Sequence, residues 1–230
     1  MPVVSPVSER TTVTCLLLLT FSTGIVDAIS VLVLGHVFVA NMTGNIIFLG
    51  FWFAPRTVVD MTAALVAFAS FVTGAILGGR LSRHLDGDVR RWLSVALGIE
   101  VVMLTTLSIL SGTGVLDYYD NTKLILIAGL AVTFGIQAAT ARQFGIQELS
   151  TTVLTTTIVG IGFDSRVAGG SGHRERLRYS VVLTMCAGAL VGATLTRWFV
   201  APVIGVSAAV VAVAAVIFRF GPRGQHVDAD

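Results

Sequence analysis

The chain has 230 residues, of which 54% are hydrophobic and only 12% charged, and its formal net charge is +2. Soluble domains carry about twice that share of charged residues, and a chain of one domain's length cannot hide so much apolar surface without lipid. The composition therefore predicts a membrane protein. It excludes a soluble enzyme, a disordered chain, a nucleic-acid binder and a secreted disulfide scaffold. The two cysteines, Cys15 and Cys186, lie in apolar runs without metal or disulfide spacing.

Membrane-spanning helices need about 20 mostly apolar residues. Six stretches meet this requirement: 12–35, 61–79, 92–111, 124–141, 179–198 and 202–220. Two further apolar segments are shorter and rich in small polar residues, 37–53 and 149–163. Each of these two segments either crosses the membrane or enters and leaves on one side.

The distribution of arginines favours the second alternative, because cytoplasmic loops are enriched in Lys and Arg. The loop after the second span holds four arginines, which places it in the cytoplasm. If 149–163 crossed the membrane, six later arginines would lie outside: Arg166, Arg174, Arg176, Arg178, Arg219 and Arg223. We therefore expect an all-α protein with six transmembrane helices, two re-entrant segments and both termini in the cytoplasm. The expected units are a cytoplasmic N-terminus (1–11), a first membrane repeat (12–111), an outer loop (112–123), a second membrane repeat (124–220) and a cytoplasmic tail (221–230).

The two halves of the chain resemble each other. Residues 73–83 align with 187–197 at an offset of 114, and 42–50 align with 154–162 at an offset of 112. Each half then consists of a span, a re-entrant segment and two more spans. Because three crossings is an odd number, the halves must have opposite orientations. Inverted repeats with broken segments are typical of transporters and channels.

Only two carboxylates lie well inside the predicted spans, Asp27 and Glu100. A charge at the centre of a span costs at least ~2.5–3.5 kcal/mol, so each needs an explanation. Each lies eight residues, about 12 Å, from one end of its span, and neither has an intramembrane Lys or Arg as a partner. Because burial disfavours a charge, we expect at least one of them to hold a proton at neutral pH. Both are candidates for proton coupling, and the alternative for Asp27 is a structural hydrogen bond at the broken segment.

Six polar residues are candidates for binding a small solute at the broken segments, where exposed backbone can bind ions or polar molecules. The alternative is that their side chains merely satisfy free backbone groups or, for Gln137, form an interhelical hydrogen bond. Gln137 lies close to the repeat-equivalent place of Asp27. The candidates are Asn41, Thr43, Asn45, Gln137, Thr155 and Thr156.

The segments 24–28 (GIVDA) and 38–45 (FVANMTGN) resemble the YoaK-type family of small bacterial inner-membrane proteins. The second-half segment 135–139 (GIQAA), with Thr151, Thr152 and Thr155, is also similar to that family. Ala138 and Thr156 depart from it, since the family usually has asparagine and glycine at these positions. The resemblance implies a multi-pass inner-membrane protein and positions of interest, but no substrate or activity.

The sequence favours a secondary transporter or exporter of a small, unidentified solute, with proton coupling at Asp27 and Glu100. A passive channel of the same architecture and a membrane scaffold or accessory protein are the alternatives. We expect no enzymatic activity, cofactor, metal or nucleic acid. The bilayer is the expected partner, and a chain of this size is compatible with a homodimer.

Overall fold

The computed structural model describes residues 7–54, 58–85, 88–143, 154–172 and 174–221, and these contain helices and no strands. Part of the second predicted re-entrant segment, residues 149–153, lies outside the described residues, as does most of the predicted tail. The helices are α1 (Glu9–Val33), α2 (Met42–Gly50), α3 (Met61–His84), α4 (Val89–Gly112), α5 (Lys123–Gln143), α6 (Leu154–Phe163), the short 3₁₀ helix η2 (Arg166–Ala168), α7 (Glu175–Thr196) and α8 (Ala201–Phe220).

Six of the described helices are long and apolar enough to cross a membrane, which confirms the predicted six spans. They contain 20 to 25 residues each. Several begin before the apolar run or end beyond it, because polar side chains cap the first turn and charged residues continue the last one. Ser8 accepts a hydrogen bond from Thr11 N, Asp60 from Ala63 N and Asp88 from Arg91 N.

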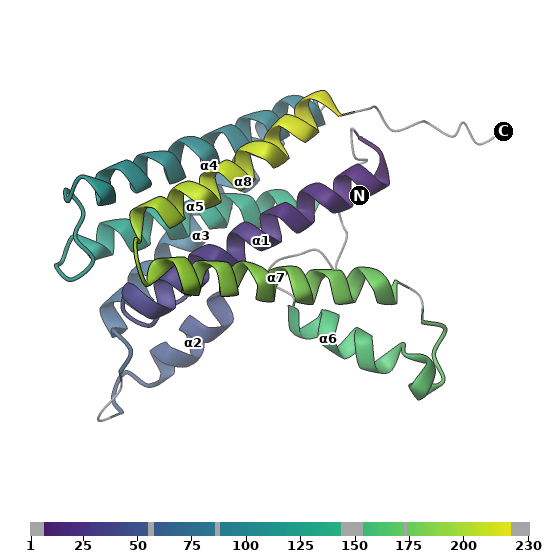
Figure 1. Ribbon diagram of the computed structural model, residues 1–230, viewed down its shortest axis with the longest axis horizontal. Coiled ribbons are helices and arrows are strands. Elements are labelled where there is room, and N and C mark those ends of the chain that lie inside the picture. The colour runs from purple at the N-terminus through teal and green to yellow at the C-terminus, as the bar shows by residue number, and fades with distance from the viewer. Residues whose placement is uncertain (1–6, 55–57, 86–87, 144–153, 173, 222–230) are drawn as a thin grey trace.

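Two short helices, α2 and α6, lie beside the bundle of long helices, on the same side but toward opposite ends (Figure 1). With nine and ten residues they are about 14 and 15 Å long, half of what a bilayer core requires. The segment that contains α2 begins and ends at the same end of the bundle, between the end of α1 and the start of α3, since Asp60 N donates to Gly35 O over 3.1 Å. α2 therefore lies on an excursion between two long helices and does not continue either of them.

The closest helix crossings are made by glycines, which form the small-residue faces that let membrane helices approach each other. In the α1–α7 crossing, a Cβ atom at Gly188 would lie 2.2 Å from Phe21 O. In the α3–α5 crossing, a Cβ atom at Gly74 would lie 2.1 Å from Val132 O. These two glycines are partners in the internal alignment, so corresponding parts of the two halves make corresponding contacts.

The remaining helix contacts follow the same correspondence. The equivalent helices are α1 and α5, α2 and α6, α3 and α7, and α4 and α8. The α1–α8 contact corresponds to the α5–α4 contact, and the α2–α3 contact corresponds to the α6–α7 contact. The equivalent helices α4 and α8 pack against each other. Consecutive helices α3 and α4 pack only loosely, as do α7 and α8. The contact pattern is therefore unchanged when the first half of the chain is exchanged with the second.

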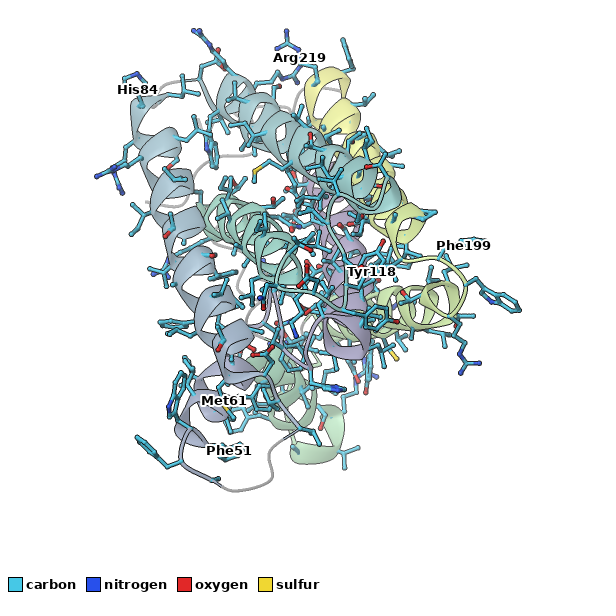
Figure 2. The ribbon with its side chains drawn as sticks, turned by 90° about the vertical axis from the view of Figure 1, so that its left-hand side faces the viewer. Phe51, Met61, His84, Tyr118, Phe199 and Arg219 are labelled. Carbon is cyan, nitrogen blue, oxygen red and sulfur yellow. The ribbon has the colours of Figure 1, made fainter. Side chains whose placement is uncertain are left out.

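One end of the bundle is strongly basic. It contains the first turns of α1, α4 and α7 and the last turns of α3, α5 and α8, and Arg90 donates there to the carbonyls of Arg219 and Gly221. Figure 2 shows His84 and Arg219 at one edge of the molecule and Phe51 and Met61 at the opposite edge. The helices place these described basic residues at or near the first end: Arg10, Arg80, Arg83, Arg90, Arg91, Arg142, Arg166, Arg174, Arg176, Arg178 and Arg219. Lys123 and Arg197 lie at the other end, where Lys123 pairs with Asp60 at 2.8 Å.

The glycine crossings predict a specific sensitivity to added side-chain volume. We expect Gly188→Ala and Gly74→Ala each to lower the midpoint of thermal unfolding in detergent, because the new methyl group would overlap a backbone carbonyl. Overpacking of this kind costs about 1–3 kcal/mol or more. Gly98→Ala is the matched control, since its Cβ would meet no atom within 4 Å, and its midpoint should stay the same or rise. Equal stability of all three variants would contradict the described crossings.

Candidate functional site: the chain break beside Asp27

Asp27 lies on the buried face of α1 and holds the segment that follows this helix. Its side chain is 5% exposed. Val39 N and Ala40 N each donate to Oδ1 over 2.9 Å, and Asn41 Nδ2 donates to Oδ2. Three N–H donors suit an ionised carboxylate, which only accepts hydrogen bonds. The structural alternative considered for Asp27 is therefore part of what this residue does.

Other polar side chains satisfy the rest of the same backbone segment. Asn45 is fully buried and bonds Phe38 twice, accepting from its N–H at 2.9 Å and donating to its carbonyl at 2.6 Å. Ser30 Oγ donates to Val37 O. The ring of Phe38 stacks on that of Phe48, with centroids 6.2 Å apart. Buried backbone groups outside helices need such partners, so α1 and α2 together hold the chain break in one conformation.

A cavity of about 330 Å³ adjoins this break, between α1 and α7. Asp27 and Asn41 are the polar side chains in its wall, and the other lining residues are apolar or small: Gly24, Ala28, Val31, Leu32, Phe38, Met185, Ala189 and Ala193. Since a water molecule occupies about 30 Å³ in the liquid, the cavity can hold a small solute with part of its hydration shell. It combines an acidic group and an amide with apolar walls.

The six predicted binding residues lie in three different places, and the sixth, Gln137, is buried on α5 away from this cavity. Asn41 lines the cavity, and Asn45 supports its wall through Phe38. Thr43, Thr155 and Thr156 are exposed on α2 and α6, and none of them lines the cavity beside Asp27. Their role as solute-binding residues stays a prediction.

Thr157 was noted in the sequence as one of a cluster of hydroxyl groups but was not chosen as a binding candidate, although the alignment of the halves contained the signal. Thr157 is aligned with Asn45 at the offset of 112. It is the buried residue of α6, as Asn45 is the buried residue of α2. Ser30 was also missed, because a serine within an apolar helix gives no sign of the loop that it contacts.

Glu100 lies on the buried face of α4 in a very different environment. It is 1% exposed, and in the described part of the chain neither carboxyl oxygen has a hydrogen-bond donor. Gln137 on α5 has a similar deficit. Its Nε2 donates to Leu19 O over 3.2 Å, but its Oε1 has no donor among the described residues. Such unpaired acceptors are rare in buried positions.

The packing of α4 against α5 places the unpaired oxygens of Glu100 and Gln137 at the same level of the bundle. Thr133 Oγ1 donates to Met103 Sδ at 3.5 Å, and Gly129 packs on Leu107 one turn further along. α4 and α5 are thus antiparallel, and the same register brings Glu100 level with the residue before Gln137.

Glu100 and Asp27 do not form one constellation. Gln137 is bonded to Leu19 of α1, and Asp27 lies eight residues further along α1, about 12 Å. In contrast, counting about 12 Å from opposite faces of a core about 30 Å thick predicts that the two acids differ by only about 6 Å in depth. Among the described residues, no group of three His, Cys, Asp or Glu side chains could hold a metal ion.

Comparisons with known proteins bear on all of these positions. The family described as "Protein of unknown function (DUF1275)" matches residues 15–217. The chain is 32% identical over 191 residues to the UPF0700 transmembrane protein YoaK of Bacillus subtilis (strain 168), covering 77% of this chain and 81% of that protein. No solved structure matches the chain. The predicted family resemblance is thereby confirmed, and the chain belongs to the DUF1275 family of membrane proteins, together with YoaK.

Proposed function

We propose that the protein is a secondary transporter of a small solute, in which proton movement is coupled to the solute at Asp27. One observation carries the proposal: the Asp27 carboxylate both lines the cavity between α1 and α7 and holds the chain break that forms part of its wall. A change in the protonation of this group therefore changes the site itself.

The helix arrangement supports an inverted-repeat frame for this transporter. Figure 1 shows α1 running opposite to α5 and α4 running opposite to α8, which are the equivalent helices of the two halves. α2 and α6 are too short to span and would be the re-entrant segments. Irregular backbone at membrane depth is tolerated where protein covers it or a watery cavity adjoins it; beside Asp27, protein groups bond the irregular backbone and a cavity adjoins it.

The coupling chemistry follows from the hydrogen bonds of Asp27. In the ionised form, its two oxygens accept three N–H groups from residues 39–41. A proton on either oxygen adds a donor and makes that oxygen a weaker acceptor, so the hydrogen bonds that it accepts are weakened or rearranged. Protonation then loosens the wall of the cavity, and ionisation restores it. Such a two-state wall can link proton movement to access of the solute.

Glu100 fits a different role in this proposal. It does not line the cavity beside Asp27, and no N–H group among the described residues stabilises its ionised form. A charge there would be buried without compensation, which is very costly. Glu100 would therefore keep its proton throughout the transport cycle, whereas Asp27 would gain and lose a proton.

The basic end of the bundle supports an orientation in a bacterial inner membrane with both termini in the cytoplasm, because most of the described arginines lie there. The α4–α5 loop, which contains Val115, would then lie outside, and η2 would lie inside.

This orientation predicts the labelling of single cysteines in intact cells, with Cys15 and Cys186 replaced by serine. A cysteine at Val115, which is 60% exposed, should react with a membrane-impermeant maleimide. A cysteine at Arg166 should react only after the cells are permeabilised. Labelling of both positions in intact cells would contradict the re-entrant interpretation of the second half, since the chain would then cross once more.

The coupling role of Asp27 predicts the result of measurements on proteoliposomes. A panel of small polar solutes is applied to a solid-supported membrane at several pH values. We expect a solute-evoked current that depends on pH in the wild type and is lost in Asp27→Asn, because the amide cannot exchange a proton. Asp117→Asn makes the same chemical change in the α4–α5 loop and should behave as the wild type.

The same experiment contains the results that would overturn the proposal. Equal currents in wild type and Asp27→Asn would indicate a passive channel in which Asp27 is structural. Absence of solute movement in folded wild type, measured also by uptake of labelled solutes to include electroneutral exchange, would indicate the scaffold alternative. Size-exclusion profiles and unfolding midpoints show that each variant is folded.

The assignment of a resident proton to Glu100 predicts that Glu100→Gln is tolerated. The amide has the shape of the uncharged acid and also carries a donor, so transport and the unfolding midpoint should stay close to wild type. The carbonyl stretch of a protonated carboxyl group should be present in the infrared spectrum of the wild type and reduced in the variant. Loss of transport in a folded Glu100→Gln protein would show that Glu100 itself exchanges the proton.

A further inference from the structure

A second and larger cavity, of about 890 Å³, lies between α3, α4 and α5 near the basic end. Most of its lining is apolar and comes from all three helices. Its remaining lining side chains are basic and come from the last turns of α3. The lining residues are Leu77, Gly78, Arg80, Leu81, Arg83, His84, Ile99, Met103, Val132 and Ile136.

The helix packing explains why this space is open. α3 and α4 are consecutive, but each packs against α5 more closely than against the other. Their apolar side chains facing the gap are therefore left uncovered, and Leu77 and Ile99 are 44% and 37% exposed. In a bilayer, the molecules that reach such a gap from the side are lipids.

The charges of the cavity are available to a ligand. Arg80, Arg83 and His84 are exposed, and none of them has a carboxylate partner among the described residues. Asp88, the nearest described acid in the chain, caps α4 by accepting from Arg91 N. The cavity thus presents two permanent positive charges and an imidazole donor above an apolar wall.

We propose that this cavity binds an anionic phospholipid, with its phosphate held by Arg80 and Arg83 and an acyl chain lying along Leu77, Ile99 and Met103. A soluble anion would make no use of the apolar wall, and an uncharged hydrocarbon would make no use of the arginines. Basic pockets between membrane helices are suited to lipid head groups. The cavity volume is in the range of pockets that enclose a ligand of several hundred daltons. The proposal is independent of transport.

The test is binding of phosphatidylglycerol and phosphatidylcholine to delipidated protein in detergent, followed by native mass spectrometry. We expect phosphatidylglycerol to bind more tightly than phosphatidylcholine. The double variant Arg80→Gln/Arg83→Gln should weaken phosphatidylglycerol binding about 25-fold, because each basic side chain near an anionic head group contributes about fivefold. Arg176→Gln/Arg219→Gln removes the same charge at the same end, outside the cavity lining, and should change binding less than twofold or so.

Two further arms distinguish a bound phospholipid from a bound soluble anion. Leu77→Trp keeps both arginines but fills the apolar part of the cavity, and it should weaken binding of the lipid as well. Glycerol phosphate, which has the head-group charge without acyl chains, should fail to displace phosphatidylglycerol. The proposal is overturned if glycerol phosphate competes effectively, if both double variants lose binding equally, or if the two lipids bind alike.

Discussion

Where the chain leaves a helix inside a membrane protein, its backbone N–H and C=O groups need new hydrogen-bond partners. This requirement organises the structure around Asp27. The chain leaves α1 after Val33 and does not start α2 until Met42. The N–H groups of Val39 and Ala40 are satisfied by the Asp27 carboxylate, and both polar groups of Phe38 by Asn45. An apolar residue at either position would leave buried backbone groups unpaired, which costs about 1–3 kcal/mol for each group. The polar side chains at the break are therefore needed for the fold before any function is considered.

The glycine crossings determine where the bundle is tight and where it is open. Gly188 and Gly74 bring α1 against α7 and α3 against α5 at backbone contact. Since each of these pairs joins one helix from each half, the two halves are interleaved. Consecutive helices such as α3 and α4 are then held apart by the helices between them. The two cavities lie beside these crossings, one between α1 and α7 and the other beside α3 and α5.

Much of this architecture could be predicted from sequence, because hydropathy reports directly on length and burial in a bilayer. The six spans, the two short polar segments and the correspondence of Gly74 with Gly188 were all evident. The site was harder to predict. Asp27, Asn41 and Asn45 were identified by residue type, but their partners are backbone groups, which have no sequence signature. The exposure of Thr43 and the burial of Thr157 depend on which face of a short helix meets its neighbour, and periodicity over nine or ten residues does not determine that.

The two buried acids show that residue type and depth are insufficient to assign a role. Asp27 accepts hydrogen bonds from N–H groups brought to it by the chain break, so an ionised carboxylate is compensated there, and its side chain also lines the adjoining cavity. Glu100 sits on a continuous helix whose N–H groups are already used, and its oxygens face a region that offers them no donor among the described residues. The uncharged form is then the one that the surroundings of Glu100 can accommodate. Of the two buried acids, Asp27 is the one with a backbone break beside it, and this difference is why the proposed proton exchange is assigned to Asp27 and not to Glu100.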